Sequence, residues 1–336
     1  MEKIIKLSVI IPTKNRCYLL KETLDSIVAQ TFNKDNFEVI IVDNGSTDKT
    51  KTISFEYTNK LQINYIYEPR PGLHEGRHAG LRASLSDILV YADDDIVAFP
   101  EWLETIYNLF QKDENIVLVG GKNLPKFESN PPFWILENWN SITKHGQVLG
   151  DLSIIDLGEF EKEVSPFYIF GCNFSVRKNI VLDAGGFNPD GMPFELIRFR
   201  GNGETHISKY VEDKCLKAYY HPLASVYHWV SNDRMTEEYF YKRRYMQGIS
   251  DAYSILRYNV TKESKKNKYL HKFKLYLKIL LGLEQIKILN EINNNLKTTD
   301  FDKNLVKYYN KGYNYLINCY ASNQEIRNWI NKKKYI

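Results

Sequence analysis

The sequence of 336 residues predicts an α/β fold, in which a mixed, mostly parallel sheet is flanked by helices and followed by a helical carboxyl-terminal region. Short apolar runs rich in β-branched residues recur through the first third of the chain, and such runs are typical of strands buried on both faces of a sheet. Segments of helical length and spacing separate them, which is the alternation of βαβ units. From about residue 236 the chain turns helical and stays so.

The elements of the first part follow in order along the chain. A strand over residues 7–11 precedes a helix over 18–30, whose apolar residues recur at helical spacing, and a strand over 37–42 completes the unit. Two further strands, over 63–67 and 87–91, enclose a helix over 75–84. Pro100 and Glu101 fit the first turn of the next helix.

The second part is less regular. Pro131, Pro132 and the segment 134–139 predict a loop that carries aromatic side chains, and strands are expected over 167–176 and 224–228. We therefore expect one domain over residues 1–235, with halves 1–110 and 111–235, and a helical extension over 236–336.

Composition narrows the class of protein. A net charge of +4 is small for this length and gives no reason to expect a nucleic-acid partner. The four cysteines lack the paired spacing of zinc sites or disulfide frameworks, so a cytoplasmic protein is expected. No apolar stretch is long enough to cross a bilayer, so any membrane contact is expected to be peripheral, at the inner face of the cell membrane.

The carboxyl-terminal region is rich in lysine over residues 265–278 and 332–334, and apolar residues recur at helical spacing over 269–292. This pattern favours a helix that packs against the rest of the chain or against a second copy, as in a homo-oligomer. A helix lying on an anionic membrane surface is the alternative.

Three adjacent carboxylates, Asp93, Asp94 and Asp95, directly follow an apolar run. They repel one another, so a fold that brings them together must supply a counter-charge. Carboxylate oxygens suit Mg²⁺ or Mn²⁺, and magnesium sites commonly include substrate phosphates. The triplet therefore predicts a divalent cation and a phosphate-bearing ligand, while a solvated acidic turn before a helix is the alternative.

Other polar residues are expected at the same edge of the sheet, because the carboxyl ends of neighbouring parallel strands meet there. They are Pro12, Thr13, Asn15 and Arg16 after the first strand, and Asp43 and Asn44 after the second. Asp43 can accept a hydrogen bond from a base or a ribose, although an Asx turn explains the same residues. In the glycine-rich segment 71–80, Arg77 can pair with a diphosphate.

Four blocks in this order, over residues 8–16, 42–48, 76–80 and 92–95, resemble the family 2 inverting glycosyltransferases of GT-A fold, a Rossmann-like fold. The resemblance covers at least residues 7–110, which would be the nucleotide-sugar binding half, with the acceptor half over 111–235. It implies that the nucleotide is bound by Pro12, Thr13, Asn15, Arg16, Asp43, Asn44, Arg77, Asp93 and Asp94. The metal ligands would be Asp95, as principal ligand, Asp93 and His228.

The resemblance also implies a catalytic base after the Gly185-Gly186-Phe187 segment, where the family usually carries a Glu-Asp pair. This chain has a single carboxylate there, Glu204, which we predict to be the base. A helix cap is the alternative role for Glu204, and the pair Glu212 and Asp213 is the rival base.

Residues 239–248 lie where processive synthases of the family carry a Gln-x-x-Arg-Trp sequence, but this chain has tyrosines there instead, which favours addition of a single sugar. Arg243 or Arg244 would either reach the diphosphate or lie on a solvated helix face. Trp134, Trp139 and Trp229 are predicted to stack on the sugars of the acceptor, and a role as hydrophobic plugs is the alternative.

The predicted function is a metal-dependent inverting glycosyltransferase that uses Mn²⁺ or Mg²⁺. It would move one sugar from a nucleotide diphosphate donor, with a UDP-sugar favoured, to a hydroxyl of a glycan or lipid-linked glycan. The alternatives are a nucleotidyltransferase and a non-catalytic nucleotide-sugar binding module. The sequence leaves the sugar, the nucleotide and the acceptor open.

Overall fold

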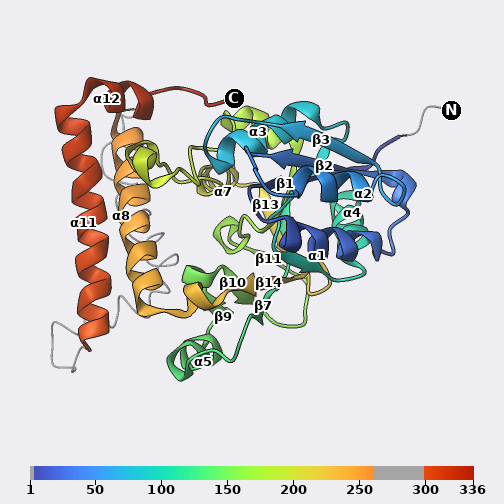
Figure 1. The fold of residues 1–336 in the computed structure, drawn as a ribbon, viewed down its shortest axis with the longest axis horizontal. Coiled ribbons are helices and arrows are strands. Elements are labelled where there is room, and N and C mark those ends of the chain that lie inside the picture. Colours follow the sequence, from blue (N-terminus) through green and yellow to red (C-terminus); the bar gives the residue numbers. More distant parts are fainter. Residues whose placement is uncertain (1–3, 261–298) are drawn as a thin grey trace.

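The computed structural model describes residues 4–260 and 299–336. It has two β-sheets, with helices on the first sheet and a helical carboxyl-terminal region beside them (Figure 1), so the predicted fold class is confirmed. The eight-stranded sheet has the order β11-β13-β6-β12-β4-β1-β2-β3, and the six-stranded sheet has the order β5-β14-β7-β10-β9-β8.

The strands of the larger sheet are β1 (Leu7–Thr13), β2 (Phe37–Asp43), β3 (Ile63–Tyr67), β4 (Ile88–Ala92), β6 (Ile116–Gly120), β11 (Lys162–Val164), β12 (Asn173–Arg177) and β13 (Lys217–Tyr220). Those of the smaller sheet are β5 (Ile96–Ala98), β7 (Asn123–Phe127), β8 (Ile142–Thr143), β9 (Gly146–Leu149), β10 (Ile154–Asp156) and β14 (Val226–Val230). The α-helices are α1 (Cys17–Val28), α2 (Thr50–Glu56), α3 (Leu73–Ala83), α4 (Trp102–Lys112), α5 (Phe133–Asn140), α6 (Lys178–Ala184), α7 (Thr205–Asp213), α8 (Glu237–Val260), α11 (Asp300–Ser322) and α12 (Gln324–Ile330). Short 3₁₀ turns are η1 (Lys34–Asn36), η2 (Gly150–Leu152), η3 (Pro166–Tyr168), η4 (Phe194–Phe199) and η5 (Asn232–Met235).

The half of the larger sheet formed by β4-β1-β2-β3 is parallel, and its strands β1, β2 and β4 are buried on both faces, whereas β12 runs antiparallel to β4. β1 pairs in parallel with β2, where Thr13 lies opposite Asp43, and with β4 on its other side. Val9 and Ile11 of β1 pack into the core under α1 and α4, whereas Ile10 points to the opposite core under α3, α6 and α7. This alternation explains why the strand is a continuous apolar run. The parallel pairing brings the ends of β1, β2 and β4 to one edge, as predicted.

The glycine-rich segment 71–80 contains the start of α3, where a helix over 75–84 was predicted. α3 begins at Leu73, after Gly72, whose φ of +116° is a conformation that favours glycine. A Cβ built on Gly80 would overlap the side chain of Ile10, so this glycine lets α3 pack closely on β1. Gly80 therefore serves packing within the fold, and does not serve the close approach of a ligand.

The second part differs more from expectation. The predicted aromatic loop contains α5, the strand predicted over 167–176 is shortened to β12 with η3 before it, and most of the smaller sheet was not predicted. The strands of that sheet are short, and β8 and β9 are only partly buried, so they lack the apolar runs that reveal longer strands.

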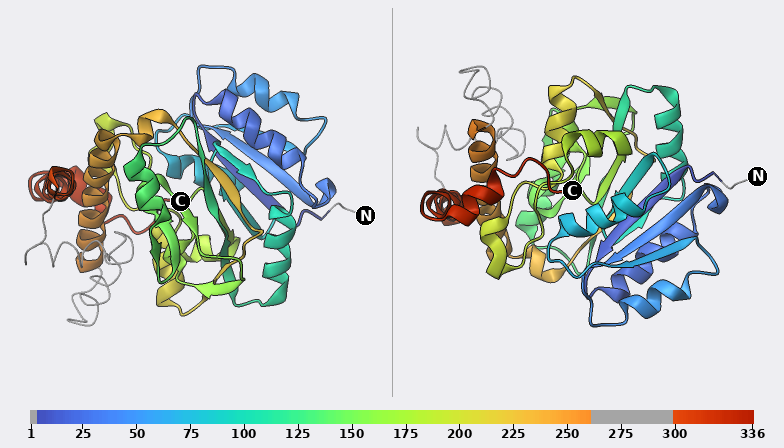
Figure 2. Two further views of the ribbon diagram at one scale, coloured as in Figure 1. Left: turned by 90° about the horizontal axis from the view of Figure 1, so that it is seen from below. Right: turned by 90° about the horizontal axis from the view of Figure 1, so that it is seen from above.

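The carboxyl-terminal helices α8 and α11 pack side by side along one side of the molecule, and both views of Figure 2 show them there. They touch at two glycines, because a Cβ built on Gly312 would overlap the backbone oxygen of Tyr245, and one built on Gly248 that of Tyr309. The lysine-rich stretch 265–278 and the helix predicted over 269–292 lie outside the described residues. In the described part of the chain, no helix has the length and apolarity required to cross a membrane. The division at residue 235 stays a prediction.

Candidate active site

A cleft of about 650 Å³ lies between the ends of β1 and β4, the smaller sheet and the helices α7 and α8. Its lining is strongly charged. The acidic residues in it are Asp93, Asp95, Asp151, Asp190, Glu204 and Asp251, and the basic ones are Arg16, Arg77, Arg200, Arg234, Arg243 and Arg244. Aspartates from the end of β4 thus share one space with Glu204 and His228, which are distant in sequence.

Arg16 supplies counter-charge to two members of the aspartate triplet. Its guanidinium donates one hydrogen bond of 2.6 Å to Asp94 and another of 2.6 Å to Asp95, while the Thr13 hydroxyl donates to Asp94 at 2.7 Å. Burial raises the pKa of Asp94 to about 7, although Arg16 acts in the opposite direction. The side chain of Arg16 is 40% exposed, so its guanidinium is accessible to a ligand in the cleft.

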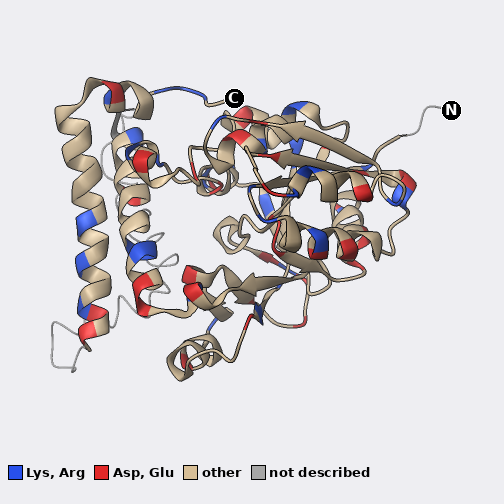
Figure 3. Cartoon of the chain, viewed as in Figure 1, with Lys and Arg blue, Asp and Glu red and all other residues tan. Residues whose placement is uncertain are grey.

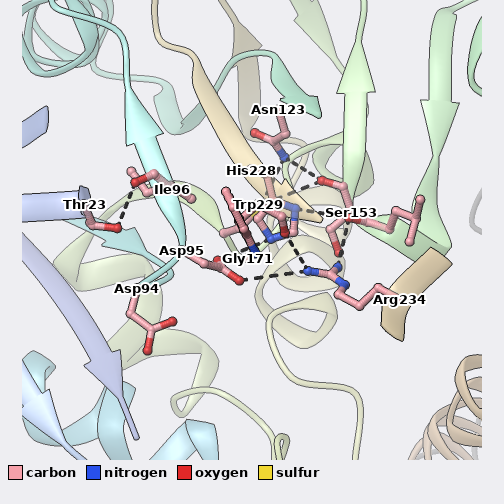
Figure 4. A network of polar contacts seen from close by, with 12 residues as sticks. Thr23, Asp94, Asp95, Ile96, Asn123, Ser153, Gly171, His228, Trp229 and Arg234 are labelled. Carbon is pink, nitrogen blue, oxygen red and sulfur yellow. Dashed lines mark hydrogen bonds and ion pairs between the residues drawn. The ribbon is translucent and has the colours of Figure 1, made fainter. Parts of the chain in front are cut away.

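Asp95 faces His228 and Arg234 (Figure 4). Its Oδ1 lies 3.4 Å from Nε2 of His228, and its Oδ2 lies 3.9 Å from Arg234. Burial alone would raise the pKa of Asp95, but the charges of His228, Arg16 and Arg234 outweigh it and hold the pKa well below its ordinary value. The carboxylate is therefore ionised.

The surroundings of Asp95 fit a divalent cation. Its Oδ1 is buried and makes no hydrogen bond within the described residues. Nδ1 of His228 lies 3.1 Å from the carbonyl oxygen of Leu152 and can donate to it, which leaves Nε2 facing Asp95. A protonated Nε2 supplies the charge that lowers the pKa of Asp95, and a deprotonated Nε2 offers a lone pair to a metal ion. Two acceptors that face each other are stabilised by a cation between them, and a backbone carbonyl behind a histidine is the usual way to orient a metal ligand.

Asp93 and Cys172 complete this group. One ligand atom each of Asp93, Cys172 and His228 lie within 4.8 Å of one another. Burial raises the pKa of Asp93, and the neighbouring Asp95 adds to this effect. Burial also raises the pKa of the Cys172 thiol well above its usual value, so the thiol is protonated. Cys172 carried no signal in the sequence, because a lone cysteine has no ligand spacing.

The residues at the ends of β1 and β2 hold the turns together. Asp43 accepts hydrogen bonds from the Tyr65 hydroxyl at 2.6 Å and from the backbone N–H of Ser46 at 2.7 Å. Asn44 donates to the carbonyl oxygens of Glu68 and Arg70, both at 2.7 Å. The bond to Ser46 is the Asx-turn contact that the sequence offered as an alternative, and the other bonds tie the side chains to β3 and the segment after it.

Asn15 and Pro12 also shape this edge. Asn15 has a φ of +54°, and its side-chain oxygen accepts from the backbone N–H of Thr47 at 2.7 Å. Pro12 packs against Gly76 of α3, where a Cβ would lie 3.0 Å from the proline ring. The two residues thereby join the turns after β1 and β2 to the helix that carries Arg77.

Glu204 stands at the N-cap position of α7 but makes no capping hydrogen bond. Its carboxylate instead accepts a hydrogen bond of 2.9 Å from Arg77, which also donates to the carbonyl oxygen of Gly171 at 3.4 Å. Arg77 is 3% exposed and lies 5.1 Å from the ring centroid of Phe187. A rigid cation thus orients the Glu204 carboxylate inside the cleft.

The rival pair, Glu212 and Asp213, lies at the other end of α7. Both carboxylates are 40% exposed, both pair with Lys209, and neither lines the cleft. Arg244 pairs with Asp151 at 2.7 Å inside the cleft, so it does not lie on a solvated helix face.

None of the three tryptophans lines the cleft as it is formed by the described residues. Trp134 packs against Phe240 and Phe301, with ring centroids 4.9 and 5.4 Å away, and Trp139 is buried in the same cluster. Trp229 lies under the amino group of Lys126 at 5.3 Å. The first two tryptophans therefore connect α5 to the carboxyl-terminal helices.

Comparison with known proteins gives the family of the chain. The model of the family described as "Glycosyl transferase family 2" matches residues 8–180. A validoxylamine A glucosyltransferase of Streptomyces hygroscopicus subsp. jinggangensis is 34% identical over 102 residues, which are 30% of this chain and 24% of that protein. The chain therefore matches only about a quarter of that relative's length.

Two other similarities extend over most of the chain. A glucosyl-dolichyl phosphate glucuronosyltransferase of Haloferax volcanii is 23% identical over 276 residues, covering 79% of this chain and 82% of that protein. Among solved structures, a mannosyltransferase from Pyrobaculum calidifontis in complex with GDP-Man and Mn²⁺ has a TM-score of 0.56 at 16% identity, covering 99% of this chain and 85% of the other. This structural likeness shows a common fold.

Proposed function

Because the chain belongs to glycosyl transferase family 2 and has the GT-A fold, we propose that it is a metal-dependent, inverting enzyme that adds one sugar to a hydroxyl of a glycan or lipid-linked glycan. The donor is a nucleotide diphosphate sugar. The observation that carries this proposal is the position of Glu204, held by Arg77 in the same cleft as Asp93, Asp95 and His228.

The donor nucleotide binds at the edge formed by the ends of β1 and β2. Thr13, Asp43 and Asn44 face this edge, while Pro12 and Asn15 hold its turns. Asp94 accepts a hydrogen bond from a ribose hydroxyl, which replaces its hydrogen bond from Arg16. The partly exposed Arg16 guanidinium is then free to turn toward the diphosphate.

Asp95, Asp93 and His228 would hold the metal, because their oxygen and nitrogen atoms are ligands that Mn²⁺ accepts. When bound, it stabilises the negative charge that builds on the leaving diphosphate. The arginines Arg16 and Arg234, which now neutralise Asp95, add positive charge at the same place.

Glu204 is the general base. Its carboxylate accepts the proton of the acceptor hydroxyl while that oxygen attacks the anomeric carbon from the face opposite the diphosphate. Arg77 keeps the carboxylate in one orientation and is itself fixed by Gly171 and Phe187. Attack from the opposite face inverts the anomeric configuration.

The acceptor is a glycan or a lipid-linked glycan. The relative from Haloferax volcanii, which matches most of this chain, is named for a dolichyl phosphate acceptor, and this favours the lipid-linked class. A lipid-linked acceptor would be met at the inner face of the cell membrane, where the enzyme binds peripherally. We favour UDP as the donor nucleotide. GDP-sugars are also tested, because the mannosyltransferase of similar fold is in complex with GDP-Man.

A panel of UDP-, GDP- and dTDP-sugars, measured with and without Mn²⁺, tests the proposal. We expect at least one of them to raise the melting temperature only when the metal is present, because a ligand that binds only the native state stabilises it. The same compound should be hydrolysed or transferred slowly, and NMR of the released or transferred sugar should show an inverted anomeric centre. No stabilisation by any compound of the panel would refute the proposed function.

A further inference from the structure

We call the part of the cleft around Glu204 its base side, and the part around Asp95 its metal side. Every arginine on the base side is paired with a carboxylate, except one. Arg77 pairs with Glu204 at 2.9 Å, Arg200 with Asp190 at 2.6 Å and Arg244 with Asp151 at 2.7 Å. Arg243 lines the same cleft but makes neither a hydrogen bond nor an ion pair within residues 4–258 and 299–336.

The position of Arg243 on α8 explains this difference. Lys242, before it, is exposed, and Arg244, after it, donates a hydrogen bond to Asp151. Arg243 lines the cleft as a positive charge without a directly paired carboxylate among the described residues. Figure 3 shows that α8 carries both basic and acidic residues. A guanidinium withdrawn from bulk water without a partner is unfavourable, and its planar fork of donors matches a phosphate or a carboxylate.

Arg243 lies near the carboxylates around Glu204 and also near Tyr239, which accepts a hydrogen bond from Arg234. The groups whose charge acts on Arg243 are, largest first, the Tyr239 phenol, Asp151, Asp190 and Glu204. Arg16 and Arg234, by contrast, contact Asp94 and Asp95 directly. An anion bound at Arg243 would therefore lie near Glu204, where the acceptor hydroxyl must be.

A mostly apolar wall, packed around Phe240, also lines the cleft. Tyr239 and Phe240 of α8 and Phe301 and Leu305 of α11 form this wall. A ligand with an anionic group at Arg243 can thus place an apolar portion against this wall.

We propose that Arg243 is the anion-binding residue of the acceptor subsite, so that the acceptor carries a phosphate or carboxylate next to the hydroxyl that receives the sugar. This inference rests on the proposed function, because it takes Glu204 as the base. Two sources offer this chemistry: a lipid phosphate, whose chain would follow the apolar wall, and an acidic glycan, whose uronic acid would present the carboxylate.

Binding of two probes, monododecyl phosphate and methyl β-D-glucuronide, tests the proposal by calorimetry. The donor site is first saturated with Mn²⁺ and the nucleoside diphosphate of whichever donor the panel identifies, so that the probes cannot bind there. We expect the wild type to bind one of the two probes, and Arg243→Gln to bind it at least tenfold more weakly. Arg243→Lys should lie in between, and Lys242→Gln, the matched control on the same helix, should bind within twofold of the wild type. The probe that binds identifies the source of the anion.

Three results would overturn the inference: no binding of either probe to the wild type, unchanged binding to Arg243→Gln, or a tenfold loss of nucleoside diphosphate affinity in Arg243→Gln. The last would make Arg243 a donor ligand. Binding of the diphosphate with Mn²⁺ also shows that each variant is folded. Failure of the proposed function is distinguishable, because then no nucleotide sugar binds to the wild type at all.

Discussion

Arg77 and Glu204 form an ion pair of 2.9 Å inside the cleft although 127 positions separate them in the sequence. Arg77 comes from the middle of α3 and Glu204 from the start of α7, two helices that cover the same face of the larger sheet. The pair links the half of the chain that carries the donor edge to the half that carries the proposed base. The Glu204 side chain does not cap α7, because its carboxylate accepts a hydrogen bond from Arg77 and none from the first turn of the helix.

Glu204→Gln is the sharpest test of the base. The amide oxygen can still accept the hydrogen bond from Arg77, so the protein should fold and bind the donor, with a lower melting temperature because the buried Arg77 loses its ion pair, while the proton acceptor is lost. We expect the rate of transfer to fall by about 10²–10⁴-fold, the usual contribution of a general base. Transfer is measured with the donor that the panel identifies, and donor affinity by thermal stabilisation.

The matched control for this prediction is Glu212→Gln, because Glu212 lies on the same helix but outside the cleft. It should transfer at the wild-type rate. If Glu204→Gln kept full activity and Glu212→Gln lost it, the base would have to be reassigned to the end of α7.

Asp95→Asn should weaken metal binding by about tenfold or more, because losing even an outer partner of a metal site commonly costs 10–100-fold. The amide keeps the shape of the side chain but not its charge, and the Oδ1 that lacks a hydrogen-bond partner within the described residues is the atom expected to bind the cation. Electron paramagnetic resonance of free Mn²⁺ in the presence of a nucleoside diphosphate measures this directly and does not depend on turnover. Asp87→Asn, an exposed residue just before β4, is the control. Equal Mn²⁺ binding by wild type and Asp95→Asn would remove Asp95 from the metal site.

How much of this site the sequence could predict depends on the range of the contacts. The turns after β1 and β2 and the triplet after β4 follow strands with strong apolar runs, so their common edge was predictable from parallel pairing. The environment of Asp95 was predictable only in part. His228 carried a signal at the end of a predicted strand, but Arg234 lies on the 3₁₀ turn η5 and Cys172 in a loop, and neither position has a periodic pattern.

The loop predicted over residues 131–139 shows a second limit of prediction from the sequence, because the structure has the helix α5 there. Two prolines precede α5, and Pro132 stands at its N-cap, where proline ends one segment and starts the next equally well. The partners that stabilise the helix, Phe240 and Phe301, are more than a hundred residues away in sequence. Local signals therefore favoured a loop, and the tertiary contacts decided for a helix.

Gly312→Ala should destabilise the protein even though alanine is the better helix former by up to about 1 kcal/mol. A Cβ at this position overlaps the backbone oxygen of Tyr245, and a backbone atom cannot turn aside as a side chain can. Overpacking of this kind costs about 1–3 kcal/mol and should lower the melting temperature by a few degrees. Thermal unfolding followed by circular dichroism measures it, with Asn314→Ala, an exposed position on the same helix, as the control. A melting temperature equal to or above that of Asn314→Ala would mean that α8 and α11 do not touch at these glycines.

Asp251→Asn should stabilise the protein at pH 8 but not at pH 5. Burial between α8 and α11 raises the pKa of Asp251 to about 7, despite hydrogen bonds from Tyr309 and Gln247 and the charge of Arg244, which act in the opposite direction. Between an ordinary carboxyl pKa of about 3.8 and this value, the folded state binds more protons than the unfolded state. The free energy of unfolding of the wild type therefore falls as the pH rises through this window.

The asparagine does not titrate, and its oxygen and amide can replace the bonds to Gln247 and Tyr309. We therefore expect the difference in melting temperature between Asp251→Asn and wild type to grow in favour of the variant from pH 5 to pH 8, by about 2–4 °C for each kcal/mol. Melting curves at three pH values check this, with the exposed Asp87→Asn as the variant whose difference should stay constant. A variant less stable than wild type by the same margin at both ends would show that Asp251 is ionised in the folded state and that Tyr309, Gln247 and Arg244 together outweigh the cost of its burial.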